Sequence, residues 1–175
     1  MLIAMAGLPG TGKSSIARAL AAEIGGVALD KDAVRAALFP PAEIEYSAMQ
    51  DDFCVAIMLH VAEYLFRKDA GKVVILDGRP FAKRYQRAEL VRFAKAHGVP
   101  LRIIECVCSE ETARARLERD AAAATHLAGN RDFALYQAVK SGFEPIEEPR
   151  LVVNSDQDLA TCVAHCLAYL NDQIA

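Results

Sequence analysis

The sequence lacks any long apolar run. None of its 175 residues lies in a segment that approaches the roughly 18 to 20 consecutive apolar residues of a membrane-spanning helix, and Asp and Glu recur throughout. We also expect no secretory signal, because no basic residues precede the apolar start and a glycine-rich stretch follows it at once. We therefore expect a cytoplasmic protein that binds no membrane.

An excess of positive charge is also missing. The formal net charge is −3, with 53% hydrophobic and 25% charged residues, which is typical of soluble globular proteins. This charge argues against a general polyanion-binding protein but leaves room for a local basic groove.

The chain lacks the even number of cysteines that a disulfide framework needs. It has five cysteines and no expected secretory signal, so the sequence predicts that no disulfide framework forms. Cys162, His165 and Cys166 fall on one face of the last predicted helix, where they could bind a metal ion. No partner pair with zinc-type spacing accompanies them, so buried reduced cysteines are the favoured interpretation.

No internal repeat, low-complexity tract or linker divides the chain, and its length suits one domain over residues 1–175. Apolar, strand-like runs alternate instead with helix-length segments. The runs lie at 2–6, 27–29, 73–76, 101–107 and 151–153. This alternation predicts βαβ units, and hence a three-layer α/β domain whose mostly parallel sheet is covered on both faces.

Residues 46–70 are predicted to form one long helix, after a short helix at 32–39 and a break at Pro40 and Pro41. Seven apolar or weakly polar residues recur at helical spacing and are expected to face the core rather than a cofactor: Met49, Phe53, Ile57, His60, Val61, Tyr64 and Leu65. The charged residues of the helix are then left to water: Asp51, Asp52, Glu63, Arg67 and Lys68. Gly71 stands where a C-terminal cap belongs.

The clearest chemical motif is Gly-Leu-Pro-Gly-Thr-Gly-Lys-Ser at 7–14. It satisfies G-x-x-x-x-G-K-[ST] between a strand-like run and an amphipathic stretch. Backbone N–H groups and the following helix N-terminus would converge on a phosphate chain, with Lys13 at the β and γ phosphates and Ser14 on Mg²⁺. We expect ATP to contact the loop and its flank: Gly7, Pro9, Gly10, Thr11, Gly12, Lys13, Ser14 and Ser15.

Ligands of open α/β sheets bind beyond the carboxyl ends of the strands. Asp30-Lys31-Asp32 follows the second run, and its two carboxylates can divide the work of phosphoryl transfer. We expect Asp32 to be the general base and Asp30 to lie beside Mg²⁺. A helix N-cap is the alternative for Asp32, and both roles can hold together.

Asp77 ends the third run. It is expected to hold Mg²⁺ through water or to act on the substrate, whereas a turn aspartate before Gly78 is the alternative. The segment 79–102 carries seven basic residues and one acidic residue, although a charged outer helix face would explain part of this. Arg79 and Arg84, near the strand end, are expected to meet an anionic acceptor or a nucleic-acid end. The lack of an aromatic-rich platform counts against extended nucleic-acid binding.

The arginines of the segment 109–120 suit a lid. A helix there, an insert at 121–130 and a helix at 132–141 would form a lid over about 110–142. Arg116 and Arg119 are three residues apart, so they share a face that could stabilise phosphate charge. Solvated pairs with Glu110, Glu111 and Glu118 are the alternative.

Taken together, four features resemble the small P-loop kinases: the loop at 7–14, Asp30-x-Asp32-x-x-Arg35, Asp77-Gly78 with basic residues after it, and the arginines at 116 and 119. The resemblance covers nearly the whole chain. It extends in particular to the AAA-type ATPase-like kinases that include the polynucleotide 5′-hydroxyl kinase domain. Chloramphenicol phosphotransferase and the zeta-toxin, gluconate and shikimate kinases are more distant relatives.

This resemblance implies five parallel strands in the order 2-3-1-4-5, with Mg-ATP on the loop. It also implies that Asp32 is the base, that Arg35 helps to hold the acceptor, and that Arg116 and Arg119 contact ATP. The sequence departs from the family at Arg79-Pro80, where relatives more often carry small or hydroxyl residues.

We expect an ATP-dependent kinase that phosphorylates a hydroxyl group of a small molecule, acting as a monomer or homodimer. A nucleic-acid 5′-hydroxyl acceptor is the second version of this hypothesis. The competing class is a nucleotide switch that hydrolyses ATP slowly. The chain has no recognisable arginine finger and no Asn-Lys-x-Asp motif, which argues against a switch.

Overall fold

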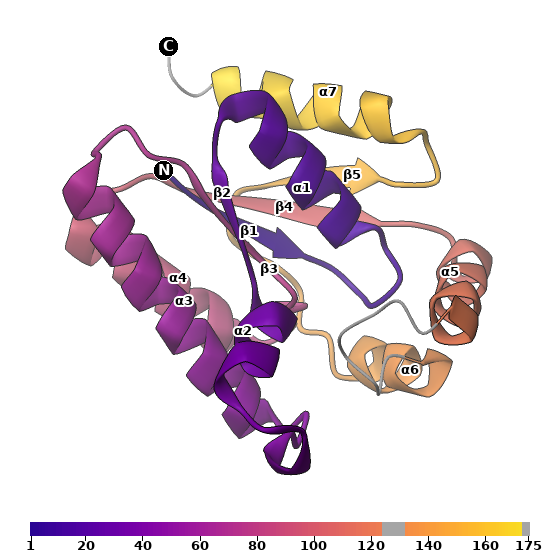
Figure 1. Cartoon of the computed structure of the whole chain (residues 1–175). Helices are drawn as coiled ribbons and strands as arrows, with labels where there is room; N and C mark the ends of the chain where they lie inside the picture. The colour runs from indigo at the N-terminus through magenta and orange to yellow at the C-terminus, as the bar shows by residue number, and fades with distance from the viewer. Residues whose placement is uncertain (124–131, 173–175) are drawn as a thin grey trace.

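The computed structural model describes residues 1–123 and 132–172, and its centre is a parallel sheet (Figure 1). The strands are β1 (Leu2–Ala6), β2 (Val27–Asp30), β3 (Val74–Asp77), β4 (Leu101–Val107) and β5 (Arg150–Asn154). Their order is β2-β3-β1-β4-β5, and all the pairings are parallel. The predicted α/β fold and strand order are confirmed.

Helices cover both faces of the sheet. In Figure 1, α1 (Lys13–Ile24) and α7 (Leu159–Asn171) lie on one face, and α3 (Ala48–Lys68) and α4 (Arg84–His97) on the other. Strand β1 is fully buried and contributes side chains to the cores on both faces of the sheet, because alternate side chains of a strand point to opposite faces. Leu2 and Ala4 join the core under α3, whereas Ile3 and Met5 join the core under α1 and α7.

Short elements gather at the carboxyl ends of the strands. Helix α2 (Lys31–Leu38) follows β2 directly, and a 3₁₀ turn, η1 (Pro41–Glu43), leads toward α3. Helices α5 (Glu110–Ala123) and α6 (Phe133–Ser141) follow β4 and lie together at this edge (Figure 1). Most of the insert expected at 121–130 lies outside the described residues.

Helices α5 and α6 are joined by side-chain contacts. Lys140 Nζ donates to Glu110 Oε2 at 2.7 Å, and this hydrogen bond lowers the pKa of Glu110 and raises that of Lys140. The Arg114 guanidinium lies 3.6 Å from the ring centroid of Phe133, which stacks on Tyr136. The two helices that were predicted to form a lid therefore contact each other.

The predicted core face of α3 is wrong. Met49, Phe53, Val61 and Tyr64 are 74, 51, 39 and 65% exposed, and His60 is exposed too, whereas Ile57 and Leu65 are partly buried. The face on the sheet is instead formed by Cys54, Val55, Met58, Leu59, Ala62 and Phe66. Both sides of this helix are apolar, so periodicity alone could not choose between them. The helix ends at Lys68, and its C-cap is Asp69 rather than Gly71.

The suggested metal cluster on α7 does not form. Cys162 and Cys166 are buried in the core, while His165 is exposed. Burial raises the pKa of both thiols, that of Cys166 to about 12, which disfavours the thiolate that a metal needs. Within residues 1–123 and 132–172, no helix is long and apolar enough to cross a membrane.

Candidate functional site

The loop between β1 and α1 depends on glycine backbone geometry. Gly7, Gly10 and Gly12 have φ angles of +125°, +79° and +77°. A Cβ at Gly7 would lie 2.3 Å from the carbonyl oxygen of Cys106, so no other residue fits there without a shift of the backbone. The loop therefore approaches β4 closely and delivers the chain into α1 at Lys13.

Lys13 is buried within this loop. Its Nζ donates to the carbonyl oxygens of Gly7 and Leu8 at 2.9 and 2.7 Å. The ammonium group is thus held against the backbone at the start of the loop.

Ser155, which follows β5, connects the loop to the predicted lid helix. Its Oγ donates to the carbonyl oxygen of Thr11 at 2.9 Å. The same Oγ accepts from Arg116 Nη1 at 2.9 Å, and Arg116 Nη2 donates to the Ser155 carbonyl oxygen at 2.7 Å. Arg116 is therefore already docked against the loop. Sequence reasoning missed Ser155, although its place just after a strand was the available signal.

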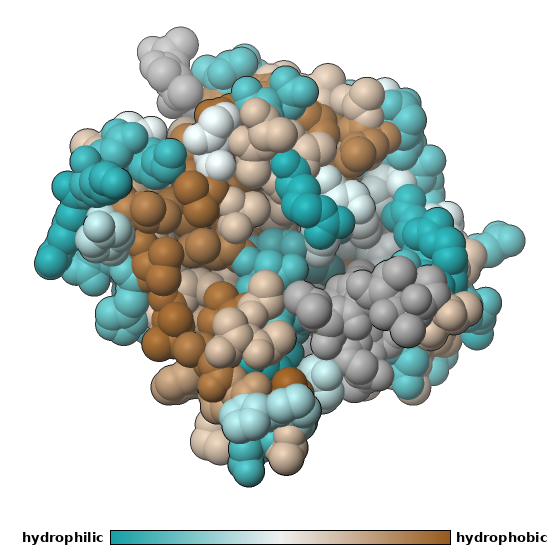
Figure 2. All heavy atoms as spheres, viewed as in Figure 1, coloured by the Kyte–Doolittle hydropathy of each residue, from teal (hydrophilic) through white to brown (hydrophobic). Residues whose placement is uncertain are grey.

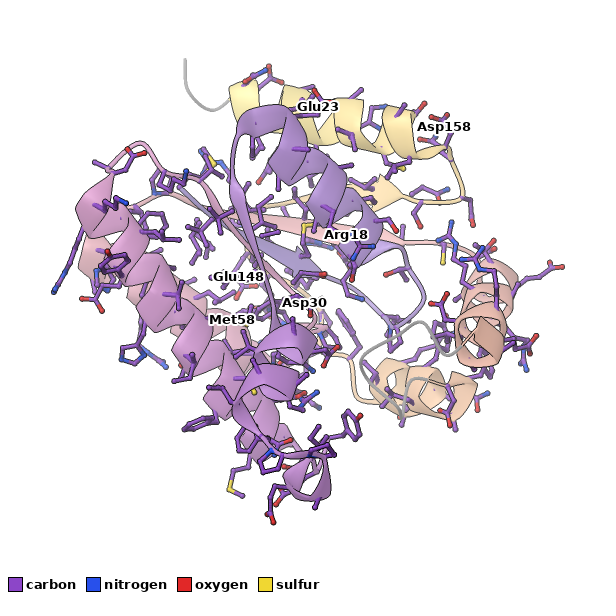
Figure 3. All side chains as sticks on the ribbon, viewed as in Figure 1. Arg18, Glu23, Asp30, Met58, Glu148 and Asp158 are labelled. Carbon is purple, nitrogen blue, oxygen red and sulfur yellow. The ribbon has the colours of Figure 1, made fainter. Side chains whose placement is uncertain are left out.

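A cavity of about 580 Å³ opens beside the loop. Arg18 of α1 and Asp30 at the end of β2 both line it, and both are labelled in Figure 3. Asp30 was predicted for this site, whereas sequence reasoning missed Arg18. The other predicted residues along the cavity wall are Gly10, Gly12, Ser14, Ser15, Arg116 and Arg119. Much of the set predicted for ATP is thus brought to one cavity, and Arg119, whose side chain is largely exposed, is at its rim.

Two carboxylates at adjacent strand ends suit a magnesium ion. Asp30 and Asp77 are partners in the register of β2 and β3. Asp77 is buried, and its Oδ1 has no hydrogen-bond partner among the residues that the structure describes. A buried carboxylate oxygen without a donor is costly unless a cation satisfies it. Mg²⁺ commonly uses one or two carboxylates together with phosphate oxygens, so Ser14, Asp30 and Asp77 fit this ion.

The interpretation of Asp32 as a helix N-cap is wrong. Asp30 caps α2 instead, since its Oδ1 accepts from the backbone N–H of Asp32 at 2.8 Å. The Asp32 side chain is buried and does not cap the helix. Its Oδ1 accepts from Arg35 Nη1 at 2.6 Å and lies 3.3 Å from Lys31 Nζ.

Asp51 of α3 completes this cluster. It pairs with Arg35 Nη2, and its Oδ1 accepts from Lys31 Nζ at 2.7 Å. The neighbouring residue, Asp52, pairs with Arg79 Nη2 at 2.5 Å. Both aspartates were expected to face water, so this expectation is wrong. Each instead holds a buried cation from a strand end, a pairing between distant segments that no local pattern shows.

Arg79 lies buried just beyond β3. Its Nη2 also donates to the Tyr85 hydroxyl at 3.3 Å, and that hydroxyl donates to Asp52 Oδ2 at 3.1 Å. Its Nε and Nη1 have no hydrogen-bond partner within the described part of the chain. Arg79 therefore has unused hydrogen-bond donors beside Asp52, which is the neighbour in α3 of Asp51.

Three of the other six basic residues of the segment pair with an acidic stretch before β5. Lys83 pairs with Glu144 at 3.5 Å, Arg84 with Glu147 at 2.7 Å and the buried Arg87 with Glu148 at 2.9 Å. Arg87 also donates to the carbonyl oxygens of Phe81 and Pro145. Arg84, expected to bind substrate, is 69% exposed in a surface pair and does not join Arg79. Most of the local charge excess is therefore structural.

Comparison with known proteins agrees with the fold. A family model described as an AAA domain matches residues 2–145. No curated protein sequence matches the chain.

Several solved structures are similar over nearly their whole length. A gluconokinase from Sinorhizobium meliloti is 22% identical, with a TM-score of 0.72 and coverage of 98% of this chain and 91% of that one. The Mycobacterium tuberculosis APS kinase CysC, in complex with AMPPNP and APS, is 21% identical, with a TM-score of 0.70 and coverage of 97 and 96%. Chaetomium thermophilum Kti12, in complex with ADP-AlF3, is 18% identical, with a TM-score of 0.75 and complete coverage of both chains.

Proposed function

The chain belongs to the AAA domain family, and from this membership and its P-loop kinase-like fold we propose that it is an ATP-dependent kinase that phosphorylates a hydroxyl group of a small molecule. Two of the similar structures are a gluconokinase and an APS kinase, both kinases of small molecules. The whole chain, residues 1–175, acts as one kinase domain in this proposal.

The observation that carries the proposal is the buried Asp32 carboxylate at the carboxyl end of β2. It is oriented by Arg35 and Lys31 and is free of the capping role that Asp30 performs. Phosphoryl transfer needs little covalent help from the protein but does need a group that accepts the proton of the attacking hydroxyl. Asp32 is this base, and Arg35 holds both it and the acceptor.

On the nucleotide side, Lys13 and the backbone of residues 7–14 bind the phosphates of ATP. Lys13 leaves the carbonyl oxygens of Gly7 and Leu8 to do so, exchanging neutral acceptors for charged ones. Ser14, Asp30 and Asp77 hold Mg²⁺, which supplies neutralisation of phosphate charge when bound.

The segment 110–142 acts as a lid in this proposal. Arg116 is anchored to Ser155 beside the loop, and Arg119 lies at the cavity rim with an exposed side chain. Closure of α5 brings Arg119 onto the phosphates, while Arg116 is already close to them. Both arginines then offset the charge of the transferred group.

On the acceptor side, Arg79 binds an anionic group of the small molecule. Its Nε and Nη1 donors are unpartnered, and a carboxylate or phosphate oxygen of the acceptor would accept a charge-assisted hydrogen bond from one of them. Neutralisation of Lys83, Arg84 and Arg87 by nearby glutamates counts against a long polyanion at this edge. We therefore favour a small acceptor over a nucleic-acid 5′-hydroxyl end.

The test is phosphate transfer from γ-labelled ATP with Mg²⁺, offered in parallel to pooled hydroxylated carboxylates and phosphates, to neutral sugars and to a 5′-hydroxyl oligonucleotide. We expect label in an anionic small molecule. Label in the oligonucleotide would replace the small-molecule proposal with the polynucleotide kinase. Label in free phosphate alone, across a broad acceptor panel, would support the nucleotide switch.

A further inference from the structure

The side of α3 that faces away from the sheet is apolar and exposed. We call Met49, Phe53, Ile57, His60, Val61 and Tyr64 the α3 seam. Figure 2 shows apolar atoms gathered in a band that follows the course of α3 in Figure 1, and Phe39 after α2 extends it through an edge contact with Phe53 at 5.8 Å. Scattered apolar residues are normal on a surface, but a contiguous band on one helix marks an interaction site.

The spacing of the seam fits another helix. Phe53, Ile57, His60 and Tyr64 follow one another at intervals of 4, 3 and 4 residues. Their average, 11/3 or about 3.7 residues, is close to the 3.6 residues of a helical turn, so the four side chains form one stripe along α3 on which another helix can pack. The intervals read the same in either direction, so the seam is complementary to its own reversed copy.

The two ends of α3 carry opposite charges. Exposed Glu43 and Glu45 lie just before the helix, and exposed Lys68 lies in its last turn beside Arg67, which also pairs with Glu63 of the same helix at 2.8 Å. Two copies that pack antiparallel bring the acidic end of each helix to the basic end of the other, and they also oppose the helix dipoles favourably. Parallel packing would place like charges together.

We propose that the protein forms a homodimer in which two α3 seams pack antiparallel about a two-fold axis. Phe53 of one chain then lies against Tyr64 of the other, and Ile57 lies against His60. Each contact occurs twice, as an interface between identical surfaces requires. Asp51 and Asp52 point to the other side of α3, where they pair with buried Arg35 and Arg79, so the dimer leaves the candidate acceptor site intact. The proposal does not depend on the kinase activity.

Light scattering coupled to size-exclusion chromatography of the full chain tests the dimer over a wide concentration range. We expect a mass of twice the 19.0 kDa of one chain. A Phe53→Arg variant should raise the dimer dissociation constant by at least about tenfold, because it places a charge at the centre of an apolar contact. The matched control is Val91→Arg on α4, which is similarly exposed but outside the seam and should leave the mass unchanged.

Circular dichroism of each variant confirms that the fold is retained. A monomer at every concentration, or a dimer that Phe53→Arg leaves intact, would overturn the proposal.

The direction of packing has its own test. A Phe53→Cys variant and a Tyr64→Cys variant are mixed and oxidised, with the natural chain oxidised alongside to reveal any cross-link through its own cysteines. Antiparallel packing predicts a disulfide between the two different variants and little in either alone. Cross-linking of the Phe53→Cys variant to itself would show parallel packing and contradict the arrangement.

Discussion

The two halves of the candidate site are built in different ways. The proposed nucleotide side is centred on one contiguous stretch, residues 7–14, whose shape follows from glycine backbone angles. The proposed acceptor side is assembled from the segments 30–35, 51–52 and 77–79, which ion pairs hold together. A site made by local backbone geometry can be identified from a motif, whereas one made by ion pairs between distant segments is visible only after folding.

The largest loss of stability is expected from a substitution at Gly7, where the backbone geometry leaves no room for a side chain. Gly7→Ala adds a Cβ 2.3 Å from the Cys106 carbonyl oxygen, at a φ of +125°. We expect a loss of about 4 kcal/mol in the free energy of unfolding, from strain and overpacking together. Gly25→Ala is the control, because its φ is +62° but no atom lies within 4 Å of the added Cβ. It should cost only about 1 kcal/mol. Urea unfolding measures both, and equal losses would contradict the close approach of the loop to β4.

The basic segment offers the next comparison, between a structural and a surface arginine. Arg87→Met removes a buried guanidinium that pairs with Glu148 and two carbonyl oxygens, so we expect a loss of about 3 kcal/mol in stability. Arg84→Met breaks only an exposed pair with Glu147 and should cost no more than about 0.5 kcal/mol. If thermal unfolding ranked the two variants in the opposite order, the segment would not be neutralised as described.

The smallest expected effect comes from a substitution that should weaken acceptor binding but leave ATP binding unchanged. Arg79→Lys keeps the charge but removes the guanidinium with its unpartnered Nε and Nη1 donors. We expect KM for an anionic acceptor to rise by about tenfold. The dissociation constant for ATP should stay unchanged, since Arg79 lies outside the loop. Arg84→Lys is the matched control and should change neither constant. A loss of ATP affinity in Arg79→Lys would place this arginine on the nucleotide side.

The sequence predicted the sheet because five apolar runs alternate with helices, a pattern that few folds share. It also predicted the cavity residues of the loop, since Gly7 to Ser14 are neighbours in the chain. It could not choose the buried face of α3, where Met58 and Leu59 compete with Phe53 and Tyr64 at the same spacing. Nor could it show that Asp51 and Asp52 would meet Arg35 and Arg79 rather than water.

The same limit explains why the sequence suggested substrate binding for Arg84 and a helix cap at Asp32 rather than Asp30. A count of charges between 79 and 102 overlooked the glutamates at 144, 147 and 148, which only the fold brings alongside. The N-cap of α2 is Asp30 rather than Asp32 because the helix begins at Lys31, two residues earlier than a cap at Asp32 would allow. That difference leaves the Asp32 carboxylate available for chemistry.

The most direct measurement compares ATP binding with phosphoryl transfer in the Asp32→Asn variant. Asparagine keeps the size of the side chain but cannot accept the proton of the attacking hydroxyl. We predict that kcat for transfer to the small-molecule acceptor falls by about a thousandfold, while the dissociation constant for Mg-ATP stays within about twofold of the natural value. Transfer at the natural rate would contradict the role of Asp32 as the base, and with it the proposed kinase mechanism.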